Sequence, residues 1–202
     1  MDMVMSARLT IFASGSSGNT AYLETPGARI LIDAGLSGRQ IRQRMLDIGR
    51  SPENLTGILV THEHTDHING LGQLANKIGI PVYCNRNTHW AAESQLGLKI
   101  QARLFETGRP FEIGDLGIES FSIPHDAQDP VGFLIRTPFG NVGFATDLGH
   151  ATKMIIERIK PSNILVLESN HDVKLLQNDT KRPWATKQRI LSRHGQIGRA
   201  HV

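Results

Sequence analysis

The sequence predicts an α/β sandwich in a single domain, from its length and from the spacing of its apolar residues. Its 202 residues are enough for one domain with a sizeable core and too few for two ordinary domains. Apolar runs separated by glycine turns predict strands, and segments with helical spacing occur in both halves of the chain. The sequence contains neither an internal repeat nor a low-complexity linker.

The first half is expected to alternate strands and helices. Leu36, Ile41 and Met45 recur at near-helical spacing, and Gly49 is expected to end that helix. Gly79 is expected to end a second helix. The expected strands are residues 8–13, 20–24, 29–32, 57–60 and 81–84, and the expected helices are residues 36–48, 68–78 and 88–96.

The second half is expected to return to strands and to finish on helices. Residues 138–141 (Pro-Phe-Gly-Asn) predict the turn between two of these strands. Pro161 is expected to stop a helix that precedes a buried strand. The expected strands are residues 116–123, 131–136, 142–146 and 164–168, and the expected helices are residues 152–159 and 184–193.

The charge balance does not by itself indicate a nucleic-acid partner. The formal net charge is +3, from 22 basic and 19 acidic residues. Lysine and arginine gather in residues 39–50 and 181–193, and charge patterning alone favours two solvated helix faces there.

Cysteine usage and hydropathy predict a cytoplasmic protein with no membrane segment. Cys84 is the single cysteine, so an intrachain disulfide is excluded. It lies in the apolar segment 80–84, which favours a buried structural thiol over a nucleophile. No apolar run approaches the roughly 20 residues that span a bilayer, and the N-terminal residues lack the layout of a signal peptide.

A histidine-rich loop directly after the expected strand 57–60 carries the strongest chemical signal. His62 and His64 are two residues apart, so in extended backbone both project to the same side and can bind one ion. Asp66 and His67, where the chain turns into the next helix, can face a second ion. Imidazole and carboxylate ligands suit zinc, manganese and iron. A polar surface loop would explain the composition of this segment, but not this spacing at a strand-to-helix junction.

Two further residues at strand ends fit the same site. His125 follows one expected strand and can complete the ligands of the first ion. Asp147 ends another, and its carboxylate can bridge two ions. Each residue alone is equally compatible with a turn or capping role, and their order after the histidine-rich loop favours the metal site.

These segments resemble a known family. Residues 62–67, His125 and Asp147 match metal motifs of the metallo-β-lactamase fold. More narrowly, the chain is similar to the bacterial YycJ/WalJ group from about residue 8 to residue 195. The segments that carry this similarity are residues 14–19, 61–72, 124–127, 145–150 and 168–172. The resemblance implies an αββα metallo-β-lactamase sandwich with two divalent metal ions at one edge. It also implies a phosphodiesterase that acts on DNA, with exonuclease activity and a link to DNA repair.

In the implied mechanism, water activated between two metal ions attacks phosphorus, and Asp66 orients that water besides binding metal. His150 and His171 are candidates to protonate the leaving oxygen or to grip a phosphate, or else to orient a metal ligand. Ser14, Ser16 and Asn19 lie in a loop whose backbone N–H groups are candidates for phosphate binding, although a tight turn explains its glycines equally well.

Other functions remain open at this level. A thioester or lactone hydrolase would share the metal loop but would need an acyl pocket that the sequence does not show. A non-catalytic metal-binding regulatory module is disfavoured, because the ligand set up to Asp147 is intact. A flavodiiron redox role is weaker still, since no flavin domain is attached. No obligate protein partner is indicated.

The resemblance stops after Gly195, where the family carries a histidine and this chain has Gln196. Residues 197–202 match one reading frame of a common sequencing adapter, ATC GGA AGA GCA CAC GTC. We expect residues 1–196 to form a partial domain and residues 197–202 to be a non-native tail, in which His201 replaces no ligand. A chain that lacks the last family ligand is expected to bind the second ion poorly and to be nearly inactive.

Overall fold

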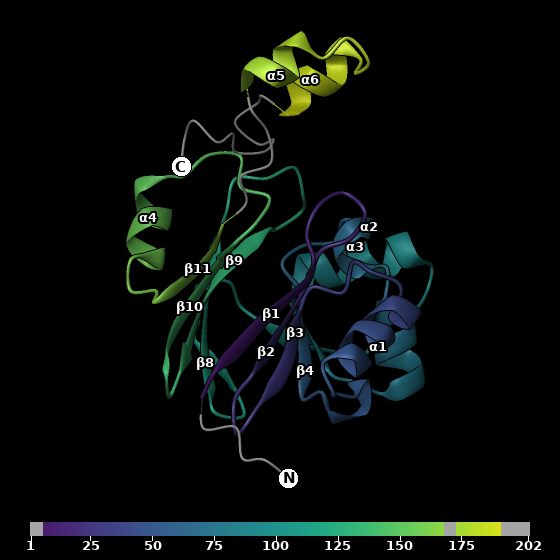
Figure 1. Ribbon diagram of the computed structural model, residues 1–202, viewed down its shortest axis with the longest axis vertical. Helices are drawn as coiled ribbons and strands as arrows, with labels where there is room; N and C mark the ends of the chain where they lie inside the picture. Colours follow the sequence, from purple (N-terminus) through teal and green to yellow (C-terminus); the bar gives the residue numbers. More distant parts are fainter. Residues whose placement is uncertain (1–5, 168–172, 191–202) are drawn as a thin grey trace.

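Two β-sheets lie face to face in the computed structural model, which describes residues 6–167 and 173–190 (Figure 1). Helices cover the outer face of the first sheet, and helix α4 (Lys153–Ile159) covers the outer face of the second (Figure 1). The layers are therefore helix, sheet, sheet and helix, which confirms the expected αββα sandwich.

The first sheet has six strands in sequence order. Its first three strands pair antiparallel, and β3 to β6 pair parallel. The strands are β1 (Arg8–Ala13), β2 (Thr20–Glu24), β3 (Arg29–Ile32), β4 (Gly57–Leu59), β5 (Val82–Asn85) and β6 (Ala102–Phe105).

The second sheet has five strands in the order β11-β10-β9-β8-β7. All its pairs are antiparallel except β10 with β11, which are parallel. The strands are β7 (Phe111–Ile113), β8 (Leu116–Ser122), β9 (Val131–Thr137), β10 (Gly140–Ala145) and β11 (Ile164–Leu167). Strands β6 and β7 were not expected from the sequence. They have only four and three residues, each includes a charged residue, and such short segments give no clear alternation of apolar and polar side chains.

Three helices begin at a capping side chain that the sequence supplies. Ser37 and Gln40 form a capping box at the start of α1 (Gly38–Asp47). Asn85 and Thr152 accept from backbone N–H groups at the starts of α3 (Arg86–Leu96) and α4. The remaining helical segments are η1 (Pro52–Asn54), α2 (Thr65–Ile68), η2 (Gly72–Ile78), α5 (Val173–Asn178) and α6 (Trp184–Ile190).

The expected helix 68–78 is instead two segments, α2 and the π-helical η2, separated near Gly70. The backbone N–H of Gly70 donates to the carbonyl of Ala34 at 2.7 Å, outside the helix. A Cβ atom at Gly70 would lie 2.6 Å from the carbonyl oxygen of Leu36, so only glycine permits this approach. The contact with the segment after β3 therefore overrides the helical pattern.

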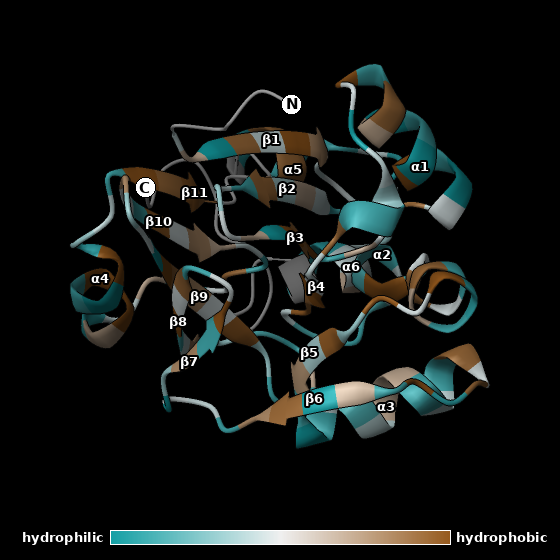
Figure 2. Ribbon diagram, turned by 90° about the horizontal axis from the view of Figure 1, so that it is seen from below, coloured by the Kyte–Doolittle hydropathy of each residue, from teal (hydrophilic) through white to brown (hydrophobic). Residues whose placement is uncertain are grey.

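The core has one layer on each face of the first sheet. On β3, Leu31 packs toward the helices, whereas Ile30 and Ile32 pack toward the second sheet. A strand buried on both faces needs a continuous apolar run, as this sequence has. In Figure 2 the strands of the two inner layers are largely brown (hydrophobic), and the outer sides of the helices are largely teal (hydrophilic). Cys84 is buried as expected, and burial raises its pKa to about 12.

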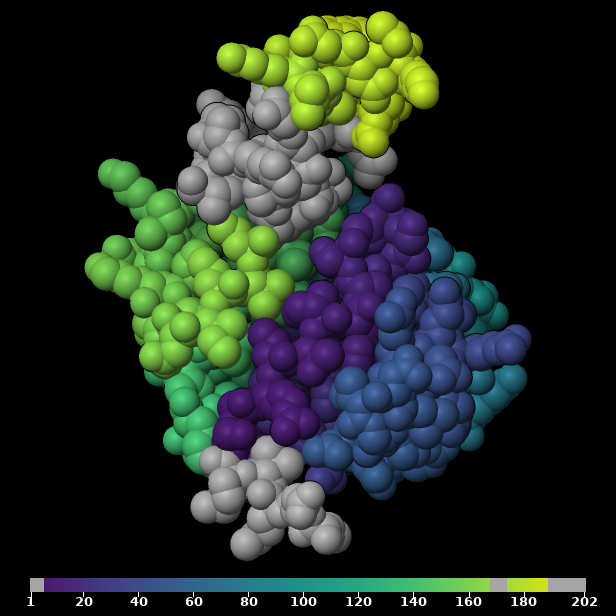
Figure 3. All heavy atoms as spheres, viewed as in Figure 1, coloured from purple at the N-terminus to yellow at the C-terminus, as the bar shows by residue number. Residues whose placement is uncertain are grey.

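The prediction of a buried strand at residues 164–168 was wrong for its described part. Ile164 and Leu165 are 50% and 44% exposed. Within the described residues, β11 is an edge strand that pairs only with β10. Figure 3 shows atoms of this part of the chain, in yellow-green, at the surface beside the purple N-terminal segment. An apolar run therefore did not distinguish an edge strand from a central one.

In the described parts of the chain, no helix combines the length and apolar character needed to cross a membrane.

Replacing Phe133 by alanine should lower the free energy of unfolding by about 3–5 kcal/mol, because its fully buried ring would leave a cavity between the sheets. Phe139 is 47% exposed and serves as the matched control, with an expected change within about 0.5 kcal/mol. Denaturant titration of both variants measures the difference, and equal losses would contradict the assignment of Phe133 to the inter-sheet core.

Candidate metal centre

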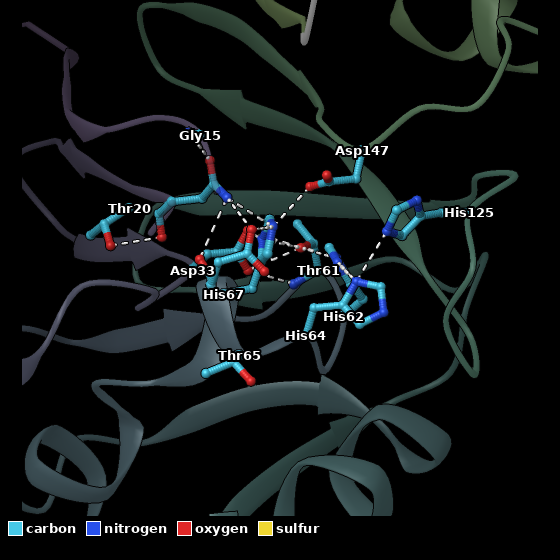
Figure 4. Close-up of polar contacts among 12 residues, drawn as sticks. Gly15, Thr20, Asp33, Thr61, His62, His64, Thr65, His67, His125 and Asp147 are labelled. Carbon is cyan, nitrogen blue, oxygen red and sulfur yellow. Dashed lines mark hydrogen bonds and ion pairs between the residues drawn. The ribbon is translucent and has the colours of Figure 1, made fainter. Parts of the chain in front are cut away.

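The predicted ligands come from three strand ends that meet at one edge of the sandwich (Figure 4). Residues 61–67 follow β4, His125 follows β8, and Asp147 follows β10. The two sheets hold these strand ends rigidly, so residues 60 to 80 positions apart in sequence face one another.

One group consists of His62, His64 and His125. The Nδ1 atom of His64 lies 3.1 Å from Nε2 of His62 and 3.2 Å from Nε2 of His125. Burial, together with the neighbouring imidazoles, lowers the pKa of His62 well below its ordinary value, so this ring is neutral. Three imidazoles whose nitrogens converge have the donor set of a divalent-metal site.

The second group consists of His67, Asp147 and Asp66. Nε2 of His67 lies 2.8 Å from Oδ2 of Asp147 and 3.7 Å from Oδ2 of Asp66. Burial opposes charge on His67, but Asp33 and Asp147 outweigh it and raise its pKa well above the ordinary value. Two carboxylates beside one imidazole, which releases a proton when it binds a metal, have the donor set of a second cation site.

Asp147 lies between the two groups. Burial opposes its negative charge, yet the hydrogen bond to His67 and the nearby imidazoles of His125 and His64 hold its pKa below the ordinary value. His62, His67 and Asp147 also form a set of potential ligands within 4.8 Å of one another. This position is the one that a bridging carboxylate would need.

Asp33 supports the site and was missed by the sequence reasoning. Its Oδ2 atom lies 2.8 Å from Nδ1 of His67, and its Oδ1 atom accepts from the backbone N–H of Thr61 at 2.8 Å. The hydroxyl of Thr61 in turn lies 3.0 Å from Nδ1 of His62. One buried carboxylate thereby orients a ligand from each group. Its signal was available, because Asp33 directly follows the apolar strand β3, as Asp147 follows β10.

The turn after β3 also fixes the backbone of the histidine-rich loop. The backbone N–H of Ala34 donates to the carbonyl of His67 at 2.8 Å. A Cβ atom at Gly35 would lie 1.6 Å from the carbonyl oxygen of Asp66, so any other residue would displace the loop. Asp33 and Asp147 both have positive φ, 59° and 53°, which turns each chain sharply at its strand end.

Of the other predicted site residues, only some lie beside the candidate ligands. Asn19 lies against Asp66 and His67, whereas Ser14 and Ser16 are exposed on the same loop. His150 is exposed three residues after Asp147. His171 and Gln196, like residues 197–202, lie outside the described residues, so the expectations about them stay predictions.

In its described part, the basic segment 181–193 is not a uniformly exposed cationic face. Lys187 is buried, and its Nζ donates to the carbonyl of Gln177 at 2.9 Å. Arg182 pairs with Asp179 at 3.1 Å. The expectation of an exposed cluster was therefore wrong for Lys187. The side chain of Arg189 and all of Arg193 lie outside the described part.

Replacing Asp33 by asparagine should weaken metal binding by about 10- to 100-fold, because the amide cannot accept from Nδ1–H of His67 as the carboxylate does. Asparagine tolerates the positive φ at this position, so the backbone is preserved. The control is Asp115→Asn, at a carboxylate that accepts from Thr25 and Gly27 instead. Equilibrium dialysis measures both variants, and unchanged affinity in Asp33→Asn would refute the orienting role.

Comparison with known proteins agrees with this geometry. A model of the beta-lactamase superfamily domain matches residues 28–188. The chain is 40% identical over 194 residues to the exodeoxyribonuclease WalJ of Streptococcus pneumoniae, covering 94% of this chain and 72% of that protein. It is 38% identical over 195 residues to the exodeoxyribonuclease YycJ of Bacillus anthracis, covering 96% and 74%.

Solved structures show the same architecture. Zn²⁺-bound PqqB from Methylobacterium extorquens superposes with a TM-score of 0.69 at 15% identity, over 94% of this chain and 80% of that one. This likeness concerns the fold alone. The sequence matches and the shared fold together show that the chain belongs to the metallo-β-lactamase superfamily of metal-dependent hydrolases, in the group that contains WalJ and YycJ.

Proposed function

We propose that this protein is a metal-dependent phosphodiesterase that degrades DNA as an exonuclease and serves in DNA repair. The observation that carries the proposal is the pairing of a two-part ligand cluster with 40% identity to an exodeoxyribonuclease over 94% of the chain. The substrate class comes from that similarity, because the ligand cluster alone would serve several hydrolytic reactions.

His62, His64 and His125 would hold one divalent ion, Asp66 and His67 would hold a second, and Asp147 would bridge them. Zinc, manganese and iron all suit this donor set. When bound, such ions lower the pKa of water and offset the charge that grows on the phosphoryl oxygens.

The side chain of Asp66 is 31% exposed, whereas those of His67 and Asp147 are 0% and 9% exposed. Asp66 is therefore the member of the second group that substrate and water can reach most easily. Its carboxylate is therefore proposed to orient the attacking water by accepting a hydrogen bond from it.

The remaining roles belong to groups that reach the phosphate. His150 and His171 are proposed to protonate the leaving oxygen or to grip a phosphate. Ser14 and Ser16 are proposed to contact a phosphate from the loop beside the second ligand group.

Replacing Asp66 by alanine in the full-length protein should lower turnover by at least about 100-fold, because a ligand and the group that orients water are both lost. The turnover of the His64→Ala and Asp147→Ala variants should also fall. Asp47→Ala, at an exposed carboxylate on α1, is the control and should keep its activity. Near-normal turnover of Asp66→Ala with normal metal loading would refute the mechanism.

A substrate panel of DNA, RNA, a phosphodiester ester and a thioester, assayed with titrated metal, should show DNA as the preferred substrate. DNA binding should weaken steeply with added salt, since phosphate contacts release counterions. Thioester hydrolysis far above DNA cleavage would replace this proposal with an acyl hydrolase. Metal binding without turnover on any member would favour a regulatory module.

A further inference from the structure

The side chain of Asn19 lies within the second ligand group. Its Nδ2 atom is 3.0 Å from Nε2 of His67 and 3.2 Å from Oδ2 of Asp66. Its Oδ1 atom accepts from the backbone N–H of Gly15 at 2.8 Å. Because Gly15 engages the oxygen of this amide, the amino end is the one that faces the ligands.

Backbone contacts hold this amide in place. The backbone N–H of Asn19 donates to the carbonyl of Asp66 at 2.7 Å, and the carbonyl of Asn19 accepts from Gly35 at 2.9 Å. A Cβ atom at Gly18 would lie 2.9 Å from the backbone of Gly35, so this loop packs closely against the turn after β3. The backbone of Asn19 therefore cannot move away from Asp66 without breaking the loop contacts, and the hydrogen bond from Gly15 orients the side-chain amide.

An amide nitrogen is a hydrogen-bond donor and a poor metal ligand, since its lone pair is delocalised into the carbonyl. A carboxylate oxygen has two acceptor positions, so Asp66 can accept from Asn19 and still bind a cation. Such a hydrogen bond restricts the rotation of Asp66, whose side chain is the most exposed of the second group.

We propose that Asn19 is a positioning residue for the second metal ion. Its N–H holds the carboxylate of Asp66 in the orientation that binds the ion, which sets the affinity of the second site but not of the first. The proposal rests on the two-ion centre of the proposed function. It differs from the phosphate-binding role that the sequence suggested, because the amide contacts the ligands themselves.

Metal titration of three variants, each made in the full-length protein, tests this proposal. Asn19→Ala should lower the affinity for the second ion by at least about 10-fold and change the affinity for the first ion by less than about 2-fold. Asn19→Asp keeps the acceptor for Gly15 but removes the donor to Asp66. Its melting temperature should show that it stays folded, yet its visible spectrum should be altered when the second site is filled with Co²⁺, because its carboxylate repels that of Asp66 instead of donating to it. Ser17→Ala, at an exposed residue of the same loop, should match the unmodified chain in all three measurements.

Two outcomes would overturn the proposal. One is an Asn19→Ala variant that binds both ions as the unmodified chain does. The other is an equal loss of both ions in Asn19→Ala, with Asn19→Asp restoring both affinities and the Co²⁺ spectrum, which would make Asn19 a loop anchor only. Calorimetric titration uses no DNA, so failure of the nuclease assignment would leave this result standing.

Discussion

The hydrogen bond between the buried carboxylate of Asp33 and His67 is the interaction on which the candidate site depends. The carboxylate is 1% exposed, so burying its charge would destabilise the fold unless both of its oxygens accept hydrogen bonds. Thr61 and His67 supply those bonds, and both belong to the loop that carries the metal ligands. The turn after β3 therefore both ends a central strand and fixes the orientation of the ligand loop.

The same turn explains why small residues gather there. The carbonyl of Asp66 lies where a side chain at Gly35 would be, and the backbone of Gly35 closely approaches Gly18. Three segments, from the loop after β1, the turn after β3 and the loop after β4, thus meet with little space for side chains. Ligand geometry in this protein is set as much by backbone packing as by the ligands themselves.

Much of the fold followed from the sequence, because most strands are buried on at least one face and the helices α1, α3 and α4 have clear capping residues. The predicted strands β1, β2 and β3 match the structure in full. The errors have physical causes. Gly70 donates to Ala34 instead of continuing a helix, and the apolar residues of β11 lie at a sheet edge. Neither tertiary contact is visible in local periodicity.

The sequence could predict which candidate ligands lie together, because strand ends of a sandwich meet at one edge and the spacing in residues 62–67 is specific. The supporting residues were harder to identify. Asp33 is a single aspartate after a strand, and only its place in the fold distinguishes it from a turn residue. Asn19 lies 47 positions from Asp66, so nothing local in the sequence connects the two.

We propose that this edge holds two divalent ions, each with ligands of its own and both in contact with Asp147. The most direct measurement is a crystal structure of the metal-saturated full-length protein, with anomalous diffraction recorded at the absorption edge of the bound metal. Our account predicts two peaks, one among His62, His64 and His125 and the other beside Asp66 and His67, with Asp147 contacting both. A single ion held by His62, His67 and Asp147, or metal elsewhere on the protein, would contradict it.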